Sequence, residues 1–195
     1  VNKDGLIETV ATTVPRLDWL NSDCPNLLVE GSSTNLHTYS ESPTGKSLEG
    51  ITLTDNQAIA PTGELDAMLF KEDTSTGKHR FFSNSFVVIS GTTYTLSMFV
   101  KNNGSDRYVF INAGALLNKS GSFNLQNQHV TSHVQVFNNY GNGWYRIGIT
   151  ATAPSTTSTN FSVQMQETPS DISYTGDESS MFIWGLQFEQ SSEVT

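Results

Sequence analysis

Aromatic rings alternate with amide, guanidinium and ammonium side chains in five short stretches of this sequence. As β-strands, these stretches would place apolar side chains on one face and the mixed aromatic and polar set on the other. A sugar ring needs such a mixture, because it has an apolar C–H face and a rim of hydroxyls. The foremost candidates for ligand contact are Phe99, Tyr108, Arg146 and Gln164, followed by Trp144, Lys101, Asn112, His133 and Gln166.

A cation on this face would favour saccharides that carry carboxylate or sulfate groups, since guanidinium binds them through paired hydrogen bonds. Burial is the competing explanation for the rings. Phe99, Phe110 and Trp144 would then be covered by the N-terminal part of the chain or by a neighbouring subunit. For any single ring we expect burial more readily than ligand contact. The polar Arg146 and the two glutamines are harder to explain in that way.

Groups that could perform catalysis are sparse. Glycoside cleavage requires two carboxylates roughly 5 to 10 Å apart in a cleft, and the outward rows contain none. Asp106 and Glu167 fall at expected strand ends or in turns, as solvated charges do. His133, Tyr108 and Arg146 could assemble a lyase site with a base beside a cation. Because no nucleophile elbow, H-E-x-x-H motif or glycine-rich phosphate loop is present, we expect a protein that is not an enzyme.

The chain length and the amino-acid composition predict the secondary structure that must position these residues. With 195 residues the chain can bury the core of one domain, and we expect a single domain over residues 1–195. Only 15% of the residues are charged, whereas Ser and Thr supply 47 positions and Asn 16. Since these polar side chains compete with the helix backbone for hydrogen bonds, an all-β chain rich in turns is expected.

Charge restricts the partners. Ten Lys and Arg against 19 Asp and Glu give a formal net charge of −9, which repels polyphosphates and anionic lipids. We therefore expect no nucleic acid and no membrane as partner, and no run approaches the roughly 20 apolar residues of a spanning helix. The single Cys24 excludes an internal disulfide. The residues from Val1 onward resemble neither a signal peptide nor a translation start, so we expect a segment of a longer polypeptide.

Short alternating stretches closed by Gly, Asn, Asp, Ser or Pro follow residue 48 and predict antiparallel strands in a sandwich or barrel. The segment 1–47 lacks sustained alternation and contains three X-Pro pairs, so we expect extended chain over a sheet edge. A linker to an upstream domain is the alternative. The predicted strands span residues 49–54, 67–71, 79–90, 94–101, 107–112, 122–125, 132–137, 143–152, 159–166 and 181–189.

Four motifs resemble, in order, those of one recurring module. They are L-V-E-G-S-S-T-N-L with T-Y-S-E over Leu28–Glu41, S-G-T-T-Y-T-L-S-M-F-V-K over Ser90–Lys101, N-G-W-Y-R over Asn142–Arg146 and I-W-G-L-Q-F-E over Ile183–Glu189. This pattern is similar to carbohydrate-binding-module-like domains of phage tail and virion proteins, which also occur beside polysaccharide-active enzymes. The resemblance spans residues 4 to 189. Four motifs in the correct order are much more specific than any one of them.

The resemblance implies a non-catalytic jelly-roll sandwich related to the galactose-binding-like folds. The N-terminal segment would belong to the domain, which would bind a polysaccharide or glycan, outside the cell or on a virion surface. Folds of this kind often carry a structural calcium ion held by oxygen ligands near the chain ends. Motif position points to Glu30 and Glu189, although hydrogen bonds or salt bridges at the sheet edge would explain both residues equally well.

The resemblance leaves two kinds of role open. In the first, the domain is a binding module, with a polysaccharide-degrading enzyme elsewhere in the same chain. In the second, it is a structural or host-attachment domain of a phage tail fibre, whose aromatic face packs against a neighbouring subunit. The motifs define the fold and identify no ligand residue, so they do not discriminate between these roles.

Overall fold

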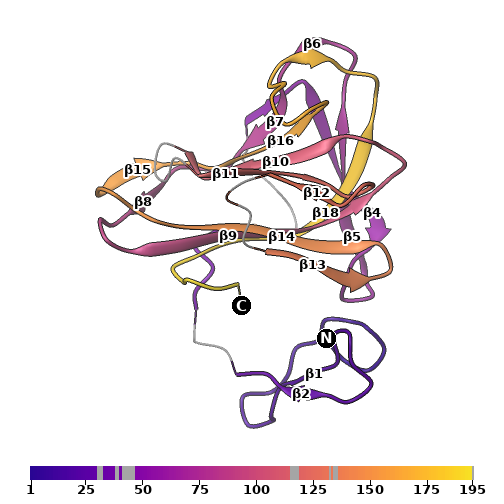
Figure 1. The fold of residues 1–195 in the computed structure, drawn as a ribbon, viewed down its shortest axis with the longest axis vertical. Coiled ribbons are helices and arrows are strands. Elements are labelled where there is room, and N and C mark those ends of the chain that lie inside the picture. Colours follow the sequence, from indigo (N-terminus) through magenta and orange to yellow (C-terminus); the bar gives the residue numbers. More distant parts are fainter. Residues whose placement is uncertain are drawn as a thin grey trace.

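The computed structural model describes residues 1–29, 33–37, 40, 47–114, 119–131, 133 and 136–194. Over these residues the chain forms two six-stranded antiparallel sheets stacked face to face, and the predicted all-β sandwich is confirmed (Figure 1). Each sheet is named here after a central strand, as the β9 sheet and the β10 sheet. No helix of the described residues is long and apolar enough to cross a membrane.

The β9 sheet contains the two longest strands, β9 and β18, of ten residues each. Strand β9 pairs with β14 on one side and with β18 on the other, so both of its neighbours in the sheet are distant from it in sequence. In order across the sheet, the strands are β13 (Val136–Gly141), β14 (Trp144–Thr152), β9 (Thr93–Asn102), β18 (Ser180–Glu189), β5 (Leu65–Glu72) and β4 (Ile51–Ile59).

The β10 sheet has shorter strands, and three two-stranded ribbons accompany the two sheets. Across the β10 sheet the order is β12 (His129–Val130), β11 (Ser120–Asn124), β10 (Tyr108–Asn112), β16 (Ser162–Gln166), β7 (His79–Phe82) and β3 (Ser47–Glu49). The ribbons are β1 (Leu17–Asp18) with β2 (Asn26–Leu27), β8 (Phe86–Val88) with β15 (Thr157–Thr159), and β6 (Thr76–Gly77) with β17 (Tyr174–Thr175).

The core lies between the two sheets and is built from alternate residues of each strand. These side chains leave water almost completely, and burying each large one stabilises the fold by roughly 1.5–3 kcal/mol. The apolar rows predicted for β9, β10, β14 and β16 all face this core. Its members include Leu96, Met98, Val100, Val109, Ile111, Phe123, Ile147, Ile149, Phe161, Val163, Met165 and Phe188.

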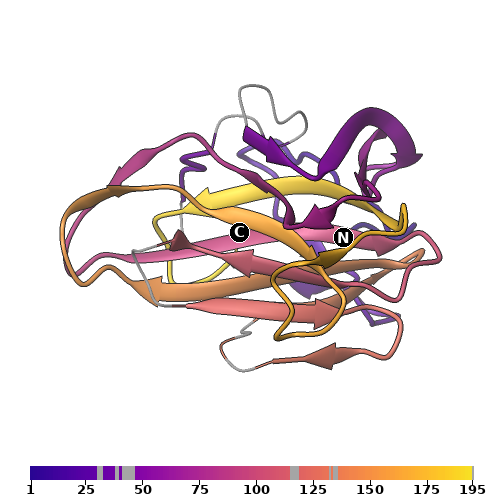
Figure 2. The same ribbon diagram turned by 90° about the horizontal axis from the view of Figure 1, so that it is seen from above.

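Residues 1–29 lie against the outer face of the β9 sheet, on the side away from the β10 sheet (Figure 1). In Figure 2, which looks from above, both sheets lie between the viewer and most of this segment. The backbone N–H of Ile7 donates to Pro61 O at 2.8 Å, and its side chain packs on a second apolar cluster on that face. Residues 1–29 therefore cover a sheet face. Asn35, Leu36 and Ser40 bond to the edge of β18 beyond its pairing with β5, so this later part of the segment follows a sheet edge, as the sequence predicted.

Two strand predictions need correction. The predicted strand 79–90 is two strands, and its halves belong to different pairings, since β7 joins the β10 sheet while β8 pairs with β15. The alternation predicted for 132–137 is shifted by one residue, which exchanges the two faces. Phe137, expected to face outward, stacks on Tyr145 in the core at a ring distance of 5.2 Å. The preceding Val134 lies outside the described residues.

Candidate functional site

The nine predicted contact residues do not share one face. Strands β9 and β14 belong to one sheet and β10 and β16 to the other, so their outward rows point to opposite sides of the sandwich. The expectation of one common surface is therefore wrong. Phe99, Lys101, Trp144 and Arg146 face outward from the β9 sheet, Tyr108, Asn112, Gln164 and Gln166 face outward from the β10 sheet, and His133 lies in a turn.

On the β9 sheet, burial accounts for two of the predicted rings. Phe99 is 3% exposed and Trp144 2%, and both belong to the apolar cluster under the N-terminal segment. The indole Nε1–H of Trp144 donates to Ile59 O at 3.1 Å. The Lys101 ammonium lies 6.0 Å from the centre of the Trp144 ring. These contacts tie β14, β4 and β9 together, which is a structural role.

Arg146 lies beside Phe99 on the same face. It is 7% exposed, and its guanidinium carbon is 5.2 Å from the centre of the Phe99 ring. Its Nη2 donates to Ser97 Oγ at 3.3 Å and also to Gln187 Oε1. Arg146 borders a cavity of about 340 Å³ that the N-terminal segment closes from the other side.

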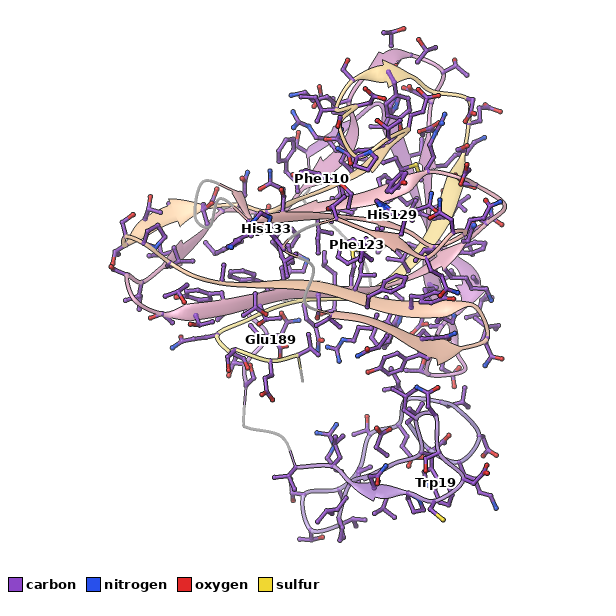
Figure 3. The ribbon with its side chains drawn as sticks, in the orientation of Figure 1. Trp19, Phe110, Phe123, His129, His133 and Glu189 are labelled. Carbon is purple, nitrogen blue, oxygen red and sulfur yellow. The ribbon has the colours of Figure 1, made fainter. Side chains whose placement is uncertain are left out.

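The outer face of the β10 sheet carries rings that are only partly covered. Tyr108 and Phe110 are half-buried, and the exposed His129 of β12 meets the Tyr108 ring edge-on at 5.8 Å. Figure 3 shows Phe110 on the outside of this sheet and Phe123 of the adjacent strand on the inside. Rings two residues apart on a strand stand about 7 Å apart, so Tyr108 and Phe110 present two neighbouring contact surfaces.

Polar side chains from the neighbouring strands stand in register with these rings. Phe110 pairs with Gln164 of β16, which pairs in turn with Arg80 of β7. Arg80 Nε donates to Glu49 Oε2 at 2.8 Å, and the guanidinium lies 4.4 Å from the centre of the Phe82 ring. We call this outer face the platform. It comprises Arg80, Phe82, Tyr108, Phe110, Asn112, His129, Gln164 and Gln166.

Arg80, Phe82, His129 and Phe110 were not among the predicted site residues, although Phe110 was expected on an outward row. A sequence signal was present for the first two. In the stretch His79–Phe82, the buried His79 and Phe81 alternate with the half-buried Arg80 and Phe82. The same alternation argument that was applied to the other strands would have placed Arg80 and Phe82 on an outward face.

The side chains of the two platform glutamines are buried, and each forms a hydrogen bond to a neighbouring part of the chain. Gln164 is 2% exposed, and its Nε2 donates to Ile172 O at 2.9 Å, which holds the loop after β16 over the sheet. Gln166 is wholly buried, and its Oε1 accepts from Ser122 Oγ at 2.9 Å. Within the part of the chain that the structure describes, Gln166 Nε2 has no hydrogen-bond partner.

A buried ion pair next to the platform anchors the following turn. The Glu72 carboxylate accepts from Arg107 Nη2 at 2.9 Å, from the hydroxyl of Tyr174 and from the backbone N–H of Asp177 at 3.1 Å. Burial, together with this carboxylate, raises the pKa of Tyr174 above its usual range. Because Arg107 immediately precedes β10 and Tyr174 belongs to β17, this cluster joins the end of the platform to the loop that Gln164 holds.

The two predictions made from the sequence for a calcium site and for a lyase site have different outcomes. Glu30 lies outside the described residues, while Glu189 is 1% exposed and its backbone bridges to Asn35. Across the described ranges, no three His, Cys, Asp or Glu side chains gather as metal ligands, and the calcium site stays a prediction because one of its two carboxylates is not described. The predicted lyase arrangement is wrong, because Tyr108 and Arg146 project from opposite faces of the sandwich.

No protein-family model and no curated protein matches the sequence. Three solved structures are similar to this chain at a low level. The first holds the CBM22-1 and GH10 modules of Clostridium thermocellum xylanase 10B in complex with xylohexaose, with 17% identity and a TM-score of 0.43 over 84% of this chain and 28% of that chain. The second is the enzymatically active domain of tailspike protein 4 from bacteriophage CBA120, with 12% identity and a TM-score of 0.43 over 77% of this chain and 20% of that chain. The third is the CBM22-1 xylan-binding domain of a Paenibacillus barcinonensis xylanase, with 13% identity and a TM-score of 0.42 over 84% of this chain and 95% of that chain.

The chain spans about a quarter of the length of the xylanase chain and a fifth of that of the tailspike chain. Likeness at these identities assigns no role to any residue here. The candidate site consequently depends on the geometry of the platform.

Proposed function

We propose that the chain is a non-catalytic module that binds a polysaccharide or glycan through the platform. The observation that carries the proposal is the set of half-buried rings of Tyr108, Phe110 and Phe82, which stand in register with polar side chains on adjacent strands. A pyranose ring would lie on these rings through its C–H face. Its hydroxyls would meet the guanidinium of Arg80 and the amide of Asn112.

The geometry favours an extended glycan over a compact ligand. Tyr108 and Phe110 stand side by side along β10, whereas Phe82 of β7 is separated from them by β16, where Gln164 is buried. A chain of sugars lying along β10 would therefore contact two rings at once. Each ring contributes about 1 kcal/mol, part of which is offset by ordering the glycan, so the affinity should be modest.

The platform offers little for catalysis. Its carboxylate neighbour Glu49 is engaged by Arg80 at 2.8 Å. Asp106 lies at the far end, where the Nδ2 of Asn124 donates to its Oδ1 at 3.3 Å, and Glu167 lies 3.7 Å from Arg107. Binding without cleavage is therefore the function that we propose for this surface. We propose that it acts outside the cell or on a virion surface, and a catalytic domain elsewhere in the same polypeptide is compatible with this role.

Affinity gel electrophoresis tests the proposal with xylan, hydroxyethyl cellulose and polygalacturonate as probes. We expect at least one polymer to retard the protein, and Phe110→Ala to weaken that retardation about fivefold, as the loss of about 1 kcal/mol implies. Phe182→Ala is the matched control, because Phe182 is a half-buried phenylalanine on the opposite face of the sandwich. Absence of retardation by neutral and anionic polymers alike would contradict the proposal.

A second candidate, assembly into a fibre, is favoured by one observation. The ribbon of β1 and β2 exposes Leu17 by 47% and Leu27 by 64%, and Val29 just beyond it by 84%. Exposed apolar side chains gathered in this way favour contact with another protein surface. Light scattering distinguishes the candidates, since a stable trimer would favour the fibre, whereas a monomer that a polysaccharide retards would favour the module.

A further inference from the structure

A covered strip runs along the middle of the platform, on the outer side of β16. In register across β10, β16 and β7, Phe110 lies beside Gln164, and Gln164 lies beside Arg80. The outward residues of β10 and β7 are half-buried. Between them, the outward residues of β16 are almost completely buried, with Ser162 7% exposed, Gln164 2% and Gln166 0%. Another part of the chain therefore covers β16 and divides the platform into two halves.

The segment above Gln164 is the connection between β16 and β17, residues 167–173, which we call the strap. Val163 and Met165 face the core, so the side chain of Gln164 between them points outward. Its Nε2 donates to Ile172 O at 2.9 Å, which places this carbonyl over the outer face of the sheet. The strap consequently folds back over β16 and separates the β10 rings from Phe82 of β7.

Few contacts attach the strap to the sandwich. Five of its seven side chains are exposed and the other two are half-buried, so no buried apolar side chain anchors it. Thr168 Oγ1 donates to Asp171 Oδ2 at 2.7 Å and the Asp171 N–H donates to Thr168 O at 3.1 Å, and both bonds are internal. Among the described residues, its polar contacts outside itself are the bond from Gln164 and the approach of Glu167 to Arg107 at 3.7 Å. A segment with so few buried contacts opens at low cost.

Both ends of the strap are firmly held. Gln166, which precedes it, is wholly buried in β16. Tyr174, which follows it, is 7% exposed, and its hydroxyl donates to the buried carboxylate of Glu72. The strap can therefore move away from β16 while β16 and β17 stay in place.

From these observations we infer that the strap is a displaceable cover, an inference that rests on the proposed function of the platform. In the open form, Gln164 Nε2 exchanges Ile172 O for a hydroxyl of the glycan, and the platform becomes continuous from Phe110 to Phe82. Outward rows on β10 and β7 stand about 10 Å apart, so a glycan that crosses the strands then contacts both. A ligand that needs the open form binds with an affinity reduced by the open fraction, and loosening the strap raises that affinity.

NMR relaxation dispersion of the ligand-free whole chain tests the opening itself. We expect exchange on the μs–ms timescale at the side-chain amide of Gln164 and at the backbone amides of residues 170–173, and none at Tyr174. Thr168→Ala combined with Pro169→Gly removes an internal bond and gives the open strap more backbone freedom, so the open fraction should rise about threefold. Pro154→Gly, at an exposed proline after β14, is the matched control and should leave this exchange unchanged. Flat profiles at Gln164 in both the wild type and the loosened variant would overturn the inference.

Affinity gels with xylan, hydroxyethyl cellulose and polygalacturonate test the effect of opening on binding. We expect the loosened variant to bind the retarding polymer about threefold more tightly than the wild type. Phe82→Ala should weaken binding more in the loosened variant than in the wild type, because the open form joins Phe82 to the β10 rings. Equal affinities of the loosened and wild-type chains, despite exchange at Gln164, would overturn the inference. A rigid strap on a chain that a polymer retards would overturn this inference alone, whereas absence of retardation would contradict the platform, so the two failures are distinguishable.

Discussion

The buried carboxylate of Glu72 allows a quantitative prediction about the support of the platform. Its side chain is 0% exposed, and the guanidinium of Arg107 donates to Oε1 from Nε at 3.1 Å and from Nη2 at 2.9 Å. Arg107→Met keeps an apolar stem but removes the cation. Breaking a buried pair in this way costs about 3–5 kcal/mol, because one charge stays buried without compensation. Tyr174 and the Asp177 backbone still donate to Glu72, so we expect about 3 kcal/mol.

Urea denaturation followed by tryptophan fluorescence measures this loss. With a slope of about 2–3 kcal/mol per molar urea, the midpoint of Arg107→Met should fall by about 1–1.5 M. The control is the double variant Glu72→Gln with Arg107→Met, in which neither charge remains. We expect it to be more stable than Arg107→Met alone, since a neutral amide requires less compensation than a buried carboxylate. The binding assay with platform ligands is then run on the double variant.

The reasoning is refuted if Arg107→Met costs less than about 1 kcal/mol, because the carboxylate of Glu72 would then be well solvated or already protonated. It is also refuted if the double variant is less stable than Arg107→Met, since the two groups would then stabilise the fold independently. A weaker polymer affinity of the folded double variant would connect the ion pair to the platform. Such an effect would act through the loop that Gln164 holds at Ile172.

Three further predictions concern stability. Hydrogen bonding from Ser179 and the nearby Arg107 guanidinium lower the pKa of Asp177 to about 2, below its unfolded value of 3.8. The contribution of the Asp177 carboxylate to the free energy of unfolding is therefore complete above pH 4 and is lost as the pH falls from about 4 to 2. Because Asp177 is 61% exposed, the loss measured by denaturation at decreasing pH should stay below about 1 kcal/mol. Asp177→Asn should remove this pH dependence. Gly114→Ala should cost more than about 2 kcal/mol by urea denaturation, because its φ is +74° and a Cβ would meet Asn160 O at 2.2 Å. Phe123→Ala should cost about 3–5 kcal/mol and Phe110→Ala much less, since Phe123 is wholly buried while Phe110 lies half-buried on the outer face; similar midpoints for the two variants would contradict this assignment of faces.

Local alternation predicted the faces of most strands because it depends only on the pleat of one strand. Leu96 and Val109 both face the core, as their parity requires. The prediction was wrong at 132–137, where the turn containing His133, with a φ of +78°, precedes a strand that begins only at Val136. A shift of one residue there exchanged the faces of Phe137 and its neighbours.

The assignment of strands to sheets could not be obtained from alternation. A row that faces outward is equally compatible with either sheet, and the choice depends on pairings such as β9 with β18, between residues about 85 positions apart. Because β9 and β10 follow each other in the chain, their outward rows were expected on one surface. In the structure the chain crosses between the layers after Asn102, which sends Phe99 and Phe110 to opposite sides.

One physical signal did separate the two outward faces. On the β9 sheet the outward set contains Phe99, Trp144 and Trp184, an apolar area too large to leave in water. Among the described residues that precede β3, the strands are the two-residue β1 and β2, which join neither six-stranded sheet. When residues 1–29 cover this face, the outward rings leave water and the segment gains an apolar surface to pack on. On the β10 sheet the rings alternate with amides and Arg80, and these rings stay half-buried instead of being covered by the N-terminal segment. The composition of an outward row, more than its parity, therefore indicates how completely the protein itself will cover it.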